Sequence, residues 1–66
     1  MTTPEEVKAA REEAGLTQAE AAALVYIAKN TWQKWEYGER RIDEGTFELF
    51  MIKTKAMQEL SEEKQK

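Results

Sequence analysis

Four polar side chains that can hydrogen-bond to nucleic-acid bases lie close together in this chain: Lys29, Asn30, Gln33 and Lys34. An asparagine amide can pair with two atoms of adenine, and a lysine ammonium can donate to O6 and N7 of guanine. Each good contact of this kind discriminates against a wrong base by about 1–3 kcal/mol. The same residue types also make ordinary solvated helix faces. The choice between these two interpretations depends on the elements that position the four side chains.

Capping signals divide the chain into helices. Thr3 with Glu6, and Thr17 with Glu20, each form a capping box that opens a helix. Asp43 is placed to cap a last helix, and no alternating pattern typical of strands occurs, so the sequence predicts an all-α fold. The predicted helices span about residues 4–14, 18–24 or 25, 28 or 29 to 37, and 44–61.

Composition excludes several classes of site. The chain has 66 residues with no cysteine and no histidine, which excludes disulfide bonds and ordinary zinc sites. No catalytic constellation is recognisable without these residue types, so we expect no enzyme activity, no catalytic residue, no metal and no cofactor. The N-terminus lacks the apolar core of a signal peptide, and no segment has the length of a membrane span. We therefore expect a cytoplasmic protein with no membrane partner.

The charges are unevenly distributed. A net charge of −3 disfavours a nucleic-acid partner, because phosphates attract cations. Residues 1–15 and 42–66 are both acidic in balance, whereas residues 29–41 carry four basic residues against two acidic ones. An acidic body with one basic segment limits non-specific DNA binding and still leaves a docking surface. A basic excess this small can also arise by chance in a segment of this length. Charge alone therefore gives only slight support to a nucleic-acid partner.

The predicted last helix, about residues 44–61, has more apolar surface than one small core needs. Its first stripe consists of Phe47, Phe50, Met51 and Thr54, and its second of Leu49, Ile52, Ala56 and Leu60. Periodicity does not decide which stripe faces the core and which faces a partner. The surplus predicts a homodimer. The candidate interface residues are Leu49, Ile52, Met57 and Leu60.

A gapless segment from Gly15 to Arg40 carries a family pattern. Its matching residues are Gly15-Leu16-Thr17-Gln18, Ala22, Ile27 and Trp35-Glu36-Tyr37-Gly38-Glu39-Arg40. In these residues the chain resembles the Cro/cI-like (XRE-type) helix-turn-helix family of phage repressors and bacterial regulators. The resemblance implies a small lambda-repressor-like bundle of four to five helices. Residues 1–66 would form a single DNA-binding domain with a helix-turn-helix core at about 17–37.

The resemblance also implies roles for individual residues. In this family the start of the third helix faces base edges in the major groove. The implied base contacts are Lys29, Asn30, Gln33 and Lys34. The implied phosphate contacts are Thr17, Gln18, Thr31, Arg40 and Arg41. Arg11 and Glu36 occupy the places of a structural salt bridge, and breaking it would cost around 3–5 kcal/mol if the pair is buried.

Two residues depart from the family pattern. Tyr26 stands where the family usually has glycine in the turn, and a tyrosine with positive φ is disfavoured. We therefore expect the turn to be reshaped or the second helix to be extended. Trp32 replaces a smaller apolar residue. Trp32 and Trp35 lie three residues apart on one helix, which indicates burial in the core rather than stacking on bases.

These patterns predict a sequence-specific regulator of transcription, a repressor of phage or mobile-element origin. It would bind an inverted-repeat operator in double-stranded DNA as a homodimer, block polymerase access, and be associated with the nucleoid when bound. The alternative is a protein-interaction module on the same scaffold, antitoxin-like or polymerase-binding, without specific DNA binding. The acidic balance of the chain motivates this alternative. Binding to DNA that weakens steeply with salt would distinguish the first from the second.

Overall fold

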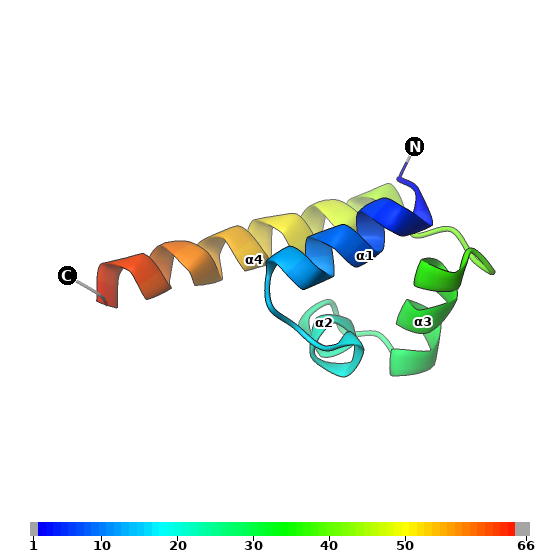
Figure 1. Ribbon diagram of the computed structural model, residues 1–66, viewed down its shortest axis with the longest axis horizontal. Helices are drawn as coiled ribbons and strands as arrows, with labels where there is room; N and C mark the ends of the chain where they lie inside the picture. Colours follow the sequence, from blue (N-terminus) through cyan, green and yellow to red (C-terminus); the bar gives the residue numbers. More distant parts are fainter. Residues whose placement is uncertain (1, 65–66) are drawn as a thin grey trace.

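The computed structural model describes residues 2–64, with the side chains described as far as residue 59. It contains the helices α1 (Pro4–Glu13), α2 (Gln18–Leu24), α3 (Lys29–Tyr37) and α4 (Glu44–Lys64) (Figure 1). No strand occurs between residues 2 and 64, so the predicted all-α helix-turn-helix bundle is confirmed, with four helices. The first three helices lie close to their predicted bounds, and α4 continues to Lys64 instead of ending near residue 61.

The predicted caps form at three helix starts. Thr3 Oγ1 accepts a hydrogen bond from the backbone N–H of Glu6 at 3.2 Å, while the Thr3 N–H donates to the Glu6 carboxylate at 3.2 Å. Thr17 and Glu20 exchange the same pair of bonds at the start of α2. Asp43 Oδ2 accepts from a backbone N–H in the first turn of α4 at 3.1 Å. Local sequence therefore sets where these helices begin.

The turn between α2 and α3 differs from the expectation. Tyr26 takes a φ of 62°, and neither the reshaped turn nor the longer helix occurs. The Ile27 N–H donates to Ala22 O at 3.0 Å and the Tyr26 N–H donates to Ala23 O at 3.2 Å. These two bonds make a Schellman motif, the closure that glycine usually allows. The Tyr26 side chain is 81% exposed, so its bulk does not have to fit into the packed core.

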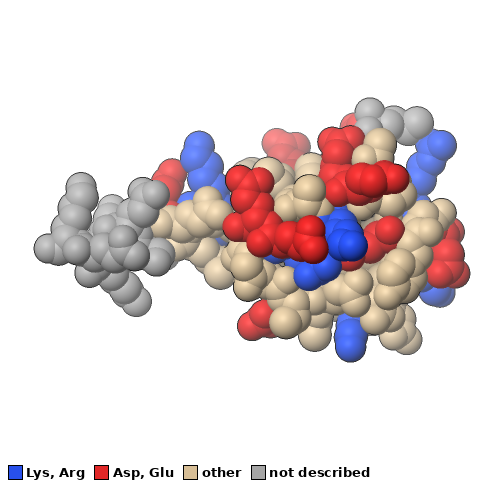
Figure 2. Space-filling view, viewed as in Figure 1, with Lys and Arg blue, Asp and Glu red and all other residues tan. Residues whose placement is uncertain are grey.

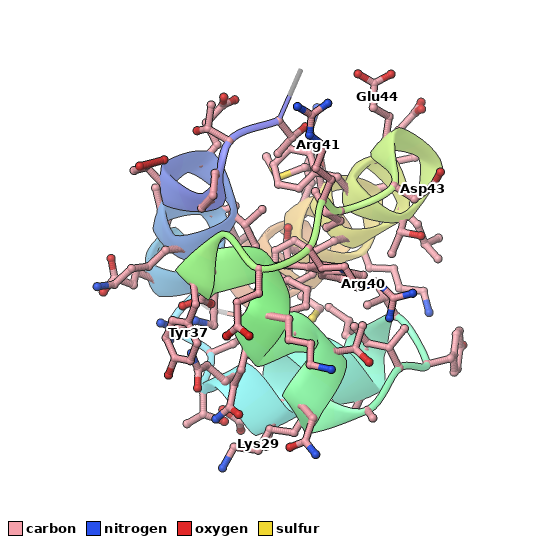
Figure 3. All side chains as sticks on the ribbon, turned by 90° about the vertical axis from the view of Figure 1, so that its right-hand side faces the viewer. Lys29, Tyr37, Arg40, Arg41, Asp43 and Glu44 are labelled. Atoms are coloured by element: carbon pink, nitrogen blue, oxygen red, sulfur yellow. The ribbon has the colours of Figure 1, made fainter. Side chains whose placement is uncertain are left out.

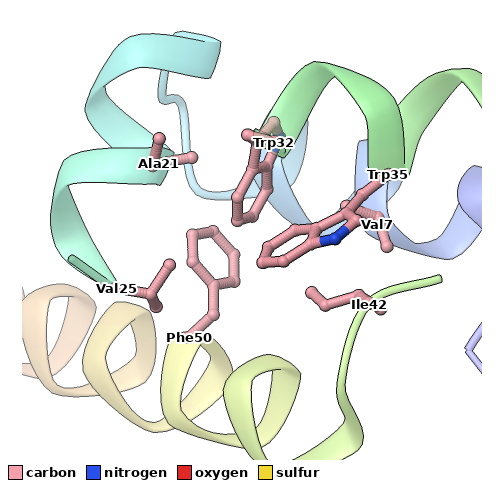
Figure 4. Close-up of a cluster of buried hydrophobic side chains, with 8 residues drawn as sticks. Val7, Ala21, Val25, Trp32, Trp35, Ile42 and Phe50 are labelled. Carbon is pink, nitrogen blue, oxygen red and sulfur yellow. The ribbon is translucent and has the colours of Figure 1, made fainter. Parts of the chain in front are cut away.

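Two tryptophans and a phenylalanine form the centre of the core (Figure 4). The ring centroids of Trp32 and Trp35 are 5.5 Å apart, and those of Trp32 and Phe50 are 5.0 Å apart. The predicted burial of both tryptophans is confirmed, since Trp32 is 0% exposed and Trp35 is buried. The complete buried apolar set is Val7, Ala21, Ala22, Val25, Trp32, Trp35, Ile42 and Phe50. Small alanines on α2 leave room for the indole of Trp32 on α3.

Helix α4 packs against the core with its first stripe. Phe50 and Thr54 are buried and Phe47 is partly buried, whereas Met51 in the same stripe is 44% exposed. The large apolar side chains of the second stripe and beyond that are exposed are Leu49, Ile52 and Met57. The side chain of Leu60 lies outside the described residues. The C-terminal part of α4 extends past the other three helices (Figure 1), and the side chains of residues 55–59 are all exposed.

Candidate nucleic-acid interface

The first half of α3 presents a polar surface to solvent. Lys29, Asn30 and Lys34 are all exposed, and Figure 3 shows Lys29 at the outer end of this helix. Residue Ala28 precedes the helix and has no side chain that can cap it. The first N–H groups of α3 therefore have no side-chain acceptor at the cap, and the positive end of the helix dipole lies beside exposed cations.

Behind this surface, one carboxylate joins three helices. Arg11 on α1 donates to Glu36 on α3 through Nε at 2.6 Å and through Nη2 at 3.2 Å. Gln18 Nε2 on α2 donates to Glu36 Oε1 at 3.1 Å, and the Trp32 indole N–H donates to Oε2. A further bond runs from Arg11 Nη1 to Leu16 O at 2.9 Å. We call Arg11, Gln18, Trp32, Gln33 and Glu36 the Glu36 cluster.

Electrostatics keep this carboxylate charged. Burial alone would raise the pKa of Glu36, but hydrogen bonds from Arg11, Trp32 and Gln18 outweigh it and hold that pKa below its ordinary value of 4.5. The same pairing raises the pKa of Arg11. The side chain of Glu36 is only 3% exposed and that of Arg11 is 14% exposed. The geometry is that of the bidentate salt bridge implied by the resemblance, and it compensates the Glu36 charge inside the protein.

Gln33 takes part in the cluster instead of standing free on the surface. It is half-buried, and its Nε2 donates to Gln18 Oε1 at 3.1 Å. Gln18, expected at a phosphate, thus holds Gln33 on one side and Glu36 on the other. The two glutamines form a chain of hydrogen bonds from the core to the exposed face of α3.

Comparison with protein families agrees with this architecture. A family model described as a helix-turn-helix domain matches residues 5–62. The chain belongs to this family. No curated protein matches the chain. In DNA-binding helix-turn-helix domains the second helix of the motif enters the major groove, and α3 holds that place in this chain.

The residues expected at phosphates surround α3 in this helix-turn-helix domain. Thr17 caps α2, and its hydroxyl accepts the backbone N–H of Glu20 at 3.1 Å. Thr31 is half-buried in the first turn of α3, while Arg40 and Arg41 are exposed in the segment that follows the helix. In Figure 3 Arg40 lies beside α3, and Arg41 lies at the opposite end of the view from Lys29. The structure thus brings Arg40 near the polar surface of α3 and places Arg41 farther from it.

The charged side chains of the helix-turn-helix domain are unevenly distributed. Figure 2 shows acidic side chains gathered over α1 around a central basic group, with further basic side chains at the edge of that face. Within residues 29–41 the exposed carboxylate is Glu39, because Glu36 is held in the interior. The exposed charge of this segment is therefore more positive than its sequence alone indicates. The basic excess of residues 29–41 favours an anionic partner near α3.

Several contacts of the domain were not predicted from the sequence. Lys53 Nζ on α4 donates to Leu24 O at 2.8 Å and to Tyr26 Oη at 2.9 Å, and it lies 4.0 Å from the centroid of the Tyr26 ring. The Lys53 bond lowers the pKa of Tyr26. The indole bond from Trp32 to Glu36 was also missed, although their four-residue spacing on one helix is a usable signal. No comparable local signal links residue 53 to residues 24 and 26.

Other kinds of site find little support in residues 2–64. No group of three or more acidic, cysteine or histidine side chains is placed to hold a metal ion in this described part. None of the helices, as far as they are described, has both the length and the apolar character needed to cross a membrane.

Proposed function

We propose that this protein is a sequence-specific, Cro/cI-like regulator of transcription that places α3 in the major groove of DNA. The observation that carries the proposal is the exposure of Lys29, Asn30 and Lys34 at the start of α3. The buried pairing of Glu36 with Arg11 also supports the proposal, because an unpaired carboxylate at this place would repel DNA phosphates. In this proposal α3 lies in the groove and the start of α2 lies against the DNA backbone.

The proposed contacts fall into two groups. The first group reads bases, with Asn30 suited to adenine and the lysines to guanine. Its members are Lys29, Asn30, Gln33 and Lys34. The second group contacts phosphates and positions the domain without reading sequence. Its members are Thr17, Gln18, Thr31, Arg40 and Arg41.

We further propose a homodimer that represses transcription from an inverted-repeat operator. One α3 helix spans only a few base pairs, and a symmetric pair doubles the length of DNA that is read. The exposed apolar residues of α4 support a dimer, and the candidates are Leu49, Ile52, Met57 and Leu60. The two half-sites would lie about one helical turn apart, and the bound dimer would block access of polymerase.

The test is a selection of DNA by the purified protein. Duplexes with a random centre of about 20 base pairs cover two half-sites, and the selected sequence is then titrated at several salt concentrations. We expect a palindromic sequence, and an affinity that falls steeply between roughly 50 and 200 mM salt. Selection of no sequence, together with no binding at low salt, would contradict the proposal and favour the protein-interaction alternative.

Single substitutions test the assigned contacts. Asn30→Ala and Lys34→Ala should each weaken binding to the selected operator by about 1–3 kcal/mol and relax preference at one base pair. Lys8→Ala is the matched control, because Lys8 is an exposed lysine on α1 and is not among the proposed DNA contacts. Circular dichroism should show the same helix content in all three variants. Unchanged operator affinity in Asn30→Ala and Lys34→Ala would mean that these residues do not contact DNA.

A further inference from the structure

The hydrogen bonds of the Glu36 cluster have a fixed direction. Glu36 is ionised, and an ionised carboxylate can only accept hydrogen bonds. Gln18 must therefore turn its amide NH₂ toward Glu36, which it reaches at 3.1 Å. The carbonyl oxygen Oε1 of Gln18 then faces Gln33. Because this oxygen can only accept a hydrogen bond, Gln33 must turn its NH₂ group toward it as the donor. The carboxylate thus sets the orientation of both amides, one after the other.

The remaining polar atoms of Gln33 are available to a ligand. Its Oε1 accepts no hydrogen bond from any residue in the described part of the chain. No buried side-chain nitrogen or oxygen atom of the described residues lacks a partner, so this unpartnered oxygen must reach solvent. An amide NH₂ also carries two hydrogens, of which one is used on Gln18. Gln33 therefore offers an exposed acceptor and one further donor.

We propose that Gln18 is a positioning residue that fixes the amide of Gln33, so that Gln33 selects a base with an exocyclic amino group. In the major groove adenine and cytosine present such a group, whereas guanine and thymine present an oxygen at the same place. An outward Oε1 of Gln33 accepts a hydrogen bond from the amino group of adenine or cytosine. It repels the oxygen of guanine or thymine. Adenine is favoured over cytosine, because its N7 can also accept the second hydrogen of Gln33 Nε2. The inference rests on the proposed function, since it needs α3 in the groove.

A rival account gives Gln18 a purely structural role. It would then only join α2 to α3, and its loss would weaken binding equally at every operator sequence. Under the positioning role, loss of Gln18 lets the Gln33 amide rotate and present either its oxygen or its NH₂. Preference would then fall at the single base pair that faces Gln33 and stay unchanged elsewhere.

The experiment measures the affinity of the protein for every single-base variant of its selected operator. Gln33→Ala first identifies the base pair that Gln33 faces, where the unchanged protein should prefer adenine by about 5- to 150-fold over guanine or thymine. Gln18→Met, which keeps the side-chain length but has no amide, should reduce this preference to about 2-fold or less and leave the preferences due to Asn30 and Lys34 intact. Gln58→Met, an exposed glutamine on α4, is the matched control and should change nothing.

A second variant keeps the inference testable if Gln18→Met folds poorly. Gln33→Glu places an acceptor outward but has no hydrogen for adenine N7, so preference should move from adenine to cytosine. A preference for guanine or thymine in the unchanged protein would overturn the inference, and so would an unaltered preference in Gln18→Met or Gln33→Glu. In these cases operator binding itself persists and the proposed function stands. Absence of any selected operator would instead overturn both.

Discussion

Two charged residues join helices in this molecule, one in the interior and one at the surface. Glu36 joins α1, α2 and α3 with its side chain almost fully buried, while Lys53 joins α4 to the end of α2 at a half-exposed position. Glu36 is matched by the opposite charge of Arg11, whereas the two hydrogen-bond acceptors of Lys53 are neutral oxygen atoms. Removing either residue breaks several hydrogen bonds.

The difference teaches that solvent access, more than the number of bonds, decides what each residue contributes. Loss of Glu36 leaves a guanidinium in a site with little water, which is costly. Loss of Lys53 exposes groups that water can satisfy. The orientation of α3 therefore depends on a buried charge pair, and the attachment of α4 near the turn depends on a weaker surface contact.

The largest effect is expected from Glu36→Gln. It removes the charge that compensates Arg11, so the free energy of unfolding should fall by about 3–5 kcal/mol. A chain of this size has a total stability of only roughly 3–10 kcal/mol, so the variant should be largely unfolded in moderate urea. The fluorescence of the two buried tryptophans can follow the transition.

The matched control for this substitution is Glu39→Gln. Glu39 is an exposed glutamate just after α3, and its change should alter stability by no more than about 0.5 kcal/mol. Equal losses in the two variants would show that burial of Glu36 does not set its contribution.

A smaller effect should follow acidification of the unchanged protein. The pKa of Glu36 is lower in the folded state than its ordinary value of 4.5, so its contribution is fully present above that pH. The contribution is lost as the pH falls through the folded-state pKa, because the unfolded chain then binds the proton first. Urea midpoints of the protein and of Glu36→Gln, measured from neutral pH downward, should converge below pH 4.5. If the difference between the two urea midpoints stayed constant as the pH fell, ionisation of Glu36 would not contribute to stability.

The smallest effect is expected from Lys53→Met. The substitution keeps the apolar stem and removes the bonds to Leu24 O and Tyr26 Oη, so stability should fall by about 1 kcal/mol, far less than for Glu36. Lys55→Met, an exposed lysine on the same helix, serves as the control and should change stability by less than about 0.5 kcal/mol. If Lys53→Met cost as much as Glu36→Gln, the contrast between buried and surface contacts would fail.

Local signals predicted most of the fold. Thr3, Thr17 and Asp43 marked helix starts because a cap acts on the backbone within one turn of itself. The spacing of Trp32 and Trp35 indicated their burial for the same local reason. The geometry of Arg11 and Glu36 was expected only from the family resemblance, since the two residues are far apart in the sequence.

Other features depend on contacts that no short pattern encodes. Tyr26 keeps a positive φ within a turn closed by two backbone hydrogen bonds and contacted by Lys53, so its local preference did not decide the conformation. The orientation of Gln18 and Gln33 depends on the charge state of a third residue. Both stripes of α4 had a suitable period, and only tertiary packing showed that Phe50 and Thr54 face inward.

The pairing of large and small side chains across α2 and α3 limits how this sequence can diverge. Trp32 fills space that Ala21 and Ala22 leave, and all three are inaccessible to solvent. A bulkier residue at either alanine would have to coincide with a smaller one at position 32, because a packed interior conserves volume. Homologous chains should therefore show covariation between these positions, and transplanting the indole alone into a relative with larger α2 residues should damage the fold.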